Sequence, residues 1–157
     1  MKRSSVFFTI IFVSAYPLQA FAGTPQEQSV KKNNVPKPIL EAFQKAYPKA
    51  TIKGFSKETD QGKLIYEVES IEGRVSRDIS YTADGTVITI EERLPVDELP
   101  SAVKSSLAKE FPKVKVSKAE KITKGSTTQY ELLLGLGREK HEVVFDGGGT
   151  IIRNEKK

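Results

Sequence analysis

Residues 35–92 of this chain occur twice, the second time 64 positions later. Apolar character is kept where identity is lost, as in Ile39 and Val103 or Phe43 and Leu107. Because one constant offset leaves no net insertion, the sequence predicts two copies of one supersecondary unit. Pairs identical at this offset are Pro36 and Pro100, Tyr66-Glu67 and Tyr130-Glu131, Gly73-Arg74 and Gly137-Arg138, and Gly85-Thr86 and Gly149-Thr150.

Each copy predicts one helix followed by antiparallel strands. In the first copy, apolar residues recur at four-residue spacing and Pro48 ends the pattern, which predicts a helix over about residues 37–46. Alternating strand patterns separated by turn residues follow as far as residue 92. We therefore predict an α+β fold of two tandem repeats, each with one helix packed on a four-stranded antiparallel sheet. The other sheet face is then open to solvent or to a partner.

The N-terminal residues have the pattern of a secretory signal peptide. A basic start, Met1-Lys2-Arg3, precedes an apolar run over residues 6–15 and a small-x-small cleavage site at Ala20-Phe21-Ala22. The alternative is a membrane anchor, but the run is shorter than the roughly 20 apolar residues of a spanning helix. We predict cleavage after Ala22, a periplasmic or secreted protein, and no stable membrane insertion after cleavage.

The predicted organisation has four parts. Residues 1–22 form the signal peptide, residues 23–34 a flexible lead-in with Val30 as its apolar side chain, residues 35–94 the first repeat and residues 95–157 the second. The chain has no cysteine, which excludes disulfides and thiol chemistry. Without Lys2 and Arg3 the formal net charge falls from +5 to +3, which is mild for this length.

A denser set of lysines could attract an anionic surface, although a soluble lysine-rich face is the more ordinary interpretation. Nucleic acid is disfavoured as a partner because no aromatic stacking series is interleaved with these lysines. The lysines are Lys104, Lys109, Lys113, Lys115, Lys118, Lys121 and Lys124.

The sequence predicts no catalytic, metal-binding or cofactor-binding residue. His141 is the single histidine, and one histidine without cysteines or further histidines does not make a zinc site. Glu67, Glu69 and the copy of Glu67, Glu131, could do acid–base work only in a pocket that changes their pKa values. Arg74 and Asp78 on the next strand are predicted as their cross-strand charge partners instead.

An asymmetry between the two open sheet faces is the more useful signal. The alternation predicts a mostly polar face in the first repeat, whereas the second carries Leu133, Val144 and Ile151. Apolar residues on an exposed face mark a contact, either with a partner protein or with the other repeat. The intramolecular contact is favoured because tandem repeats bury a shared seam. As candidate partner contacts we predict Glu67, Leu133, Val144 and Ile151.

The order of motifs resembles the PepSY-like repeats of exported bacterial proteins, in the group described as β-lactamase-inhibitor-like. The first copy reads AYPKATIKGF, IYEVESIEGR and DISYTADGTVI, and the second EFPKVKVSKA, QYELLLGLGR and VVFDGGGTII. The resemblance covers both repeats. It implies a β-lactamase-inhibitor-protein-like fold and recognition of a protein, because related units occur in propeptides that inhibit proteases. No contact residue of that inhibitor has a matching motif here.

From the residues and the resemblance together we expect an exported, non-enzymatic protein-binding module without a cofactor. Its partner would be a protein of the cell envelope, and it would inhibit or escort a peptidase or another envelope enzyme. The alternative is a binder of a small ligand or of an anionic lipid or glycan surface through the lysines.

Overall fold

The computed structural model describes residues 27–157, so the predicted signal peptide and its cleavage site lie outside the described part. No helix in the described part is long and apolar enough to cross a membrane. The elements in chain order are β1 (Gln28–Ser29), η1 (Lys32–Asn34), α1 (Lys37–Ala46), β2 (Thr51–Asp60), β3 (Lys63–Glu72), β4 (Val75–Tyr81), β5 (Val87–Arg93), η2 (Val96–Glu98), α2 (Ser101–Glu110), β6 (Lys115–Lys124), β7 (Thr127–Leu136), β8 (Glu139–Asp146) and β9 (Ile151–Lys156).

The two long helices begin and end at prolines, as the sequence predicts. Pro36 and Pro100 precede the first helical residues, where a missing N–H costs nothing. Both helices stop one residue before a proline, at Tyr47 and Phe111, which take the same non-helical conformation with φ of −131° and −132°. The prediction of a helix over residues 37–46 is confirmed.

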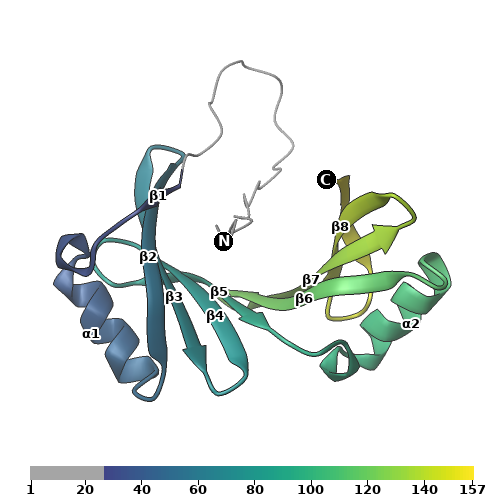
Figure 1. The fold of residues 1–157 in the computed structure, drawn as a ribbon, viewed down its shortest axis with the longest axis horizontal. Coiled ribbons are helices and arrows are strands. Elements are labelled where there is room, and N and C mark those ends of the chain that lie inside the picture. Colours follow the sequence, from purple (N-terminus) through teal and green to yellow (C-terminus); the bar gives the residue numbers. More distant parts are fainter. Residues whose placement is uncertain (1–26) are drawn as a thin grey trace, which may run out of the picture.

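The nine strands of residues 27–157 form one antiparallel sheet in sequence order, and the β5–β6 pair joins the two repeats. Ile90 of β5 lies opposite Thr123 of β6, and Arg93 lies opposite Glu120. Directly opposite residues share a face of the sheet. Because Ile90 packs under α1 and Ala119, on the same face of β6 as Thr123, packs under α2, both helices cover one face (Figure 1).

Each helix covers a separate apolar core. Side chains such as Ile39 and Val103 are completely buried between helix and sheet, and burial of one such side chain stabilises the fold by about 1.5–3 kcal/mol. The core of the first repeat contains Val35, Ile39, Phe43, Phe55, Val68, Ile79 and Tyr81. The core of the second contains Leu99, Val103, Leu107, Ala119, Leu132, Leu134, Val143 and Phe145. The predicted α+β fold with a helix on each four-stranded unit is confirmed.

The described part of the lead-in is ordered, which corrects the prediction of a flexible segment for these residues. The short strand β1 pairs with β2, and the amide of Val30 donates to the carbonyl of Phe55 at 2.8 Å. The side chain of Val30 packs against the first core. The backbone pairing and this one apolar contact fix residues 27–34 along the outer edge of the sheet.

Gly149 allows the β8–β9 turn to lie directly against α2. Its φ is +84°, and a Cβ atom there would come within 2.5 Å of the carbonyl oxygen of Ala102. We expect Gly149→Ala to lower the free energy of unfolding by about 2 kcal/mol, because left-handed strain and a backbone clash add together. Urea unfolding measures this. Gly147→Ala, in the same turn with open space around it, is the control and should change stability little; equal losses in both variants would contradict the contact.

Candidate functional site

The sheet face away from the helices is lined with carboxyl groups. Val68, Ile79, Ala119, Leu132 and Val143 point to the helices, so their neighbours along each strand point to the other side. We call this surface the acidic face. Carboxyl groups on it include those of Glu67 and Glu69 of β3, Asp78 of β4, Glu91 of β5, Glu120 of β6, Glu131 of β7 and Glu142 of β8.

In the second repeat the chain neutralises these carboxylates itself. Arg153 Nη2 lies 3.0 Å from Glu131 Oε2 and 2.6 Å from Glu142 Oε1. Lys157 Nζ lies 2.8 Å from the other oxygen of Glu142, which is completely buried. Lys118 Nζ lies 2.6 Å from Glu120. Buried carboxylates of this kind require such partners, because an uncompensated charge in the interior is very costly.

Arg153 also explains the burial of Val144. Glu131, Val144 and Arg153 lie side by side in one row across β7, β8 and β9. The guanidinium group reaches Glu131 from the far side of Val144, so the arginine side chain passes over Val144. Val144 is 4% exposed as a result. A residue covered by its own chain does not contact a partner directly.

In the first repeat the carboxylates face one another instead of cations. Glu69, Asp78 and Glu91 are directly opposite one another across β3, β4 and β5. Within residues 27–157, no lysine or arginine nitrogen lies within 4.0 Å of a carboxyl oxygen of Glu67, Asp78 or Glu91. Of the two predicted partners, Asp78 lies directly opposite Glu69 but carries the same charge, and Arg74 lies in the β3–β4 turn and not on the strand.

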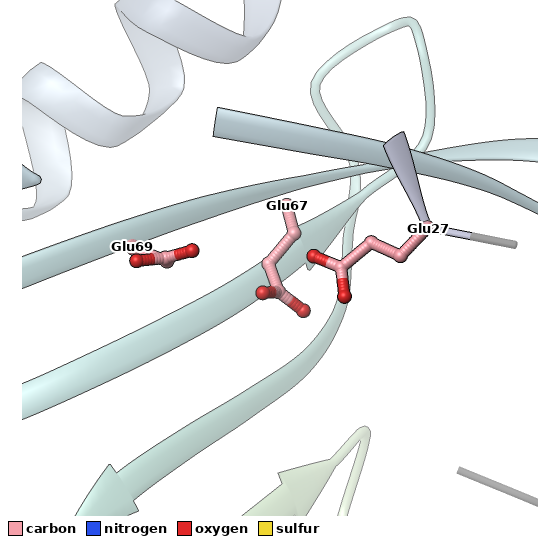
Figure 2. A group of neighbouring side chains, drawn as sticks. All are labelled: Glu27, Glu67 and Glu69. Carbon is pink, nitrogen blue, oxygen red and sulfur yellow. The ribbon is translucent and has the colours of Figure 1, made fainter. Parts of the chain in front are cut away.

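Three carboxyl groups of the first repeat form a tight group. One oxygen atom from each of Glu27, Glu67 and Glu69 lies within 4.8 Å of the others. Figure 2 shows the carboxyl group of Glu67 between those of Glu69 and Glu27. Oε1 of Glu27 is buried and has no hydrogen-bond partner. This arrangement concentrates negative charge at the β1 end of the acidic face.

The surroundings raise the pKa values of these groups. Burial raises the pKa of Glu67 to about 8, and the charges of Asp78, Glu27, Glu91 and Glu69 add to the effect. Burial followed by neighbouring carboxylates raises the pKa of Asp78 to about 6 and of Glu91 to about 7, although Lys118 counteracts the rise at both. In the second repeat burial and Glu142 raise the pKa of Glu131 to about 8, despite the lowering effect of Arg153.

Chemically, the acidic face can hold cations and exchange protons near neutral pH. A nearby positive charge would return these carboxyl groups to their ionised form. The group formed by Glu27, Glu67 and Glu69 offers three carboxylates, whereas Ca²⁺ prefers six to eight oxygen ligands. An organic cation that donates several hydrogen bonds suits a row of carboxylates better than this partial set suits a metal ion.

The structure places the four predicted contact residues in different surroundings. Glu67 is half-buried at the centre of the first-repeat half of the acidic face. Leu133 is half-buried between Lys118 and Glu142, and Val144 is buried under Arg153. The placement of Ile151 on the open face is wrong, since Ile151 packs against the core under α2.

Sequence reasoning also missed Arg153 as an organising residue of the face. The usable signal was the substitution of this arginine for Thr89, its equivalent 64 positions earlier, beside two carboxylates that both repeats keep. His141 lies on the helix side of its strand, and its ring nitrogen Nδ1 lies 3.0 Å from Asn154 Oδ1 there.

The predicted lysine-rich surface is divided between several parts of the fold. Lys118 points to the acidic face, whereas Lys121, opposite Glu92, lies on the helix side of β6. Lys104 of α2 donates a hydrogen bond to the carbonyl of Asp97 at 2.9 Å. The lysines are therefore spread over α2 and both faces of β6.

The described residues form one sheet with helices on a single face and a charged opposite face. The chain belongs to the family described as "Putative beta-lactamase-inhibitor-like, PepSY-like", whose model matches residues 24–89 and again residues 64–153. The two matches agree with the tandem repeat. The comparison with curated proteins gave no match.

Solved structures share this fold. One, described as "putative periplasmic proteins" from Bacteroides eggerthii, has a TM-score of 0.68 at 20% identity, over 78% of this chain and 88% of that chain. A BLIP-like protein from Bacteroides fragilis has a TM-score of 0.63 at 20% identity, over 76% of this chain and 84% of that chain. The predicted β-lactamase-inhibitor-like fold is thus confirmed.

Proposed function

We propose that this chain is an exported module that binds a protein partner through the acidic face. The observation that supports it best is the row of carboxyl groups in the first repeat, desolvated on a face that neither α1 nor α2 covers and without an ion pair to Glu67, Asp78 or Glu91 among residues 27–157. Keeping like charges together in this way costs stability, and a partner that brings positive charge recovers it.

The partner that fits is a protein with a basic patch in the same compartment. Export follows from the signal-peptide pattern of residues 1–22. Family membership favours an enzyme of the cell envelope as the partner, with inhibition or escort as the consequence of binding. The alternative, attraction of an anionic surface through the lysines, is less favoured because those lysines do not share one face.

Capture from the periplasmic extract of the source cell tests this function. We expect one protein to be retained by the wild-type chain and by Glu41→Gln, a neutralised exposed glutamate of α1, but not by Glu67→Gln. With the partner purified, the dissociation constant should rise at least about tenfold in Glu67→Gln, because a desolvated charge pair is lost. Activity of the captured enzyme with and without the chain then tests inhibition.

Two outcomes would contradict the proposal. Equal retention by wild-type and Glu67→Gln chains would place the contact elsewhere. Salt-sensitive binding to vesicles that contain anionic lipid, without any captured protein, would favour the lysines instead, because contacts of exposed charges fade with ionic strength.

A further inference from the structure

The two repeats hold their carboxylates in the same geometry. In the second repeat, a row across three strands contains Glu131, Val144 and Arg153, and the equivalent row in the first contains Glu67, Ser80 and Thr89. Both rows end at a register shift in the same place, after Val144 and after Ser80. The position that provides the arginine in one repeat is therefore occupied by a threonine in the other.

The acidic partners of that arginine are nevertheless kept. Glu131 and Glu142, which bind Arg153 at 3.0 and 2.6 Å, correspond to Glu67 and Asp78. The first repeat thus has the two carboxyl groups of a guanidinium site without the guanidinium group. This internal comparison shows which ligand such a pair takes, because the same chain holds one in its other half.

Shorter side chains than those of the second repeat stand around the unmatched pair. Gly54 stands where the second repeat has Lys118, and the carboxyl group of Glu69 lies 3.3 Å from the place that a Cβ of Gly54 would occupy. Ser80 and Thr89 replace Val144 and Arg153. The buried Oε1 of Glu27, which has no hydrogen-bond partner, adds an acceptor at the same place.

We propose that the Glu67–Asp78 pair receives an arginine side chain of the protein partner, seated in the first repeat as Arg153 is seated in the second. This rests on the proposed function and names the chemistry of its contact. Arginine fits better than lysine because one guanidinium group donates to two carboxyl groups at once, as Arg153 does. The raised pKa of Glu67 supports the assignment, since a bound cation would relieve it.

The site can be probed without knowing the partner. The purified chain is titrated with N-acetyl-arginine amide while the carboxyl carbon signals of its Glu and Asp residues are followed by NMR. We expect Glu67 and Asp78 to respond first, and the pKa of Glu67 to fall by about one pH unit or more at saturation. N-acetyl-citrulline amide, of similar shape but uncharged, should have no effect. Exposed Glu41 reports nonspecific attraction.

Variants give a second, independent measurement. Glu67→Gln and Asp78→Asn preserve shape and should each abolish the response to the arginine amide. Thr89→Arg places a guanidinium group of the chain itself at the Glu67–Asp78 pair. We therefore expect a lowered pKa of Glu67 and no further response to the arginine amide. Thr89→Gln, long but neutral, should leave the pKa of Glu67 unchanged. If Thr89→Arg does not fold, the titration of Glu67→Gln and Asp78→Asn decides the matter alone.

The proposal is overturned if the arginine amide and citrulline amide act alike, or if CaCl₂ moves the Glu67 and Asp78 signals while the arginine amide does not. Its failure differs from failure of the proposed function. A captured partner whose binding requires Glu67 but whose arginines are all replaceable would refute the arginine site and keep the function. A response to arginine amide without any captured partner would keep the arginine site and refute the proposed function.

Discussion

We expect Arg153→Ala to be among the most destabilising single substitutions in this protein, lowering the free energy of unfolding at pH 8 by about 3–5 kcal/mol. The reason is the burial of what it leaves behind. Glu131 is 4% exposed and Glu142 is completely buried, and both lose their guanidinium partner. Glu131, with a pKa of about 8, can take up a proton, so most of the cost falls on Glu142, which is left with Lys157 alone. The loss of cover over Val144 adds to the cost.

Urea unfolding of matched variants checks this expectation. Arg138→Ala removes an arginine from an exposed turn and should cost little. Combining Arg153→Ala with Glu131→Gln should recover part of the loss, because the orphaned charge is removed with its partner. At pH 5 the cost should shrink, since the raised pKa of Glu131 leaves it protonated there. An equal cost in Arg138→Ala, or no recovery in the double variant, would mean that the ion pairs contribute nothing specific.

The difference between Arg153 and its equivalent Thr89 explains why carboxylates of the second repeat have a cationic partner within the chain and those of the first repeat do not. The two repeats share one strand register, so their carboxyl groups keep the same positions. An arginine at one position of this register provides an ion pair within the chain, and a threonine at the equivalent position does not. Arg153 completes its site internally, whereas Thr89 leaves Glu67 and Asp78 unmatched. The second-repeat half of the acidic face therefore has ion pairs within the chain, and the first-repeat half leaves Glu67 and Asp78 accessible to a cation from outside.

The repeat predicted the fold well because the 64-residue offset preserves every turn and bulge together. Helix limits followed from Pro36, Pro48 and their copies, whose effect on the backbone is local. The register between strands was harder, since it depends on how each turn closes. Glu69 was therefore correctly placed on the open face and beside Asp78, whereas Arg74 was wrongly placed on the neighbouring strand and lies in the turn.

Two further misses have local physical causes. The register shift after Val144 adds a residue to β9, and a one-residue shift exchanges the faces of the sheet, so Ile151 turns to the core. The two-residue strand β1 is too short for an alternation to be visible in the sequence. Its position depends on backbone pairing with β2 and on Val30, which are contacts between residues distant in the chain.

The raised pKa values predict that the protein loses stability as the pH rises from about 4.5 to 8. Glu67 titrates near 8 in the folded chain, against an ordinary value of 4.5. Between these values the folded state holds a proton that the unfolded state has released, so the free energy of unfolding falls with rising pH. Glu131, Glu91 and Asp78 act in the same direction, with pKa values of about 8, 7 and 6.

Among the carboxyl groups of the first repeat, Glu67 should contribute most to the fall of the free energy of unfolding with pH, so neutralising it should have the largest effect. We expect Glu67→Gln to be at least as stable as the wild type at pH 4.5 and about 2–4 kcal/mol more stable at pH 8, where the wild type pays for desolvation and for repulsion from Glu27, Glu69, Asp78 and Glu91. Thermal and urea unfolding across this pH range measure both curves. Glu41→Gln on the exposed side of α1 is the control and should follow the wild type.

The sign of this effect separates a binding surface from a structural one. A carboxylate kept for folding stability would be destabilising to remove, as we expect for Glu142, which pairs with Arg153 and Lys157. Glu67 is expected to behave in the opposite way, because its charge costs the isolated chain stability and returns it only when a cation is bound. If Glu67→Gln lowers stability at pH 8, the charge is already satisfied within the chain, and the first-repeat half of the acidic face has no need of a partner.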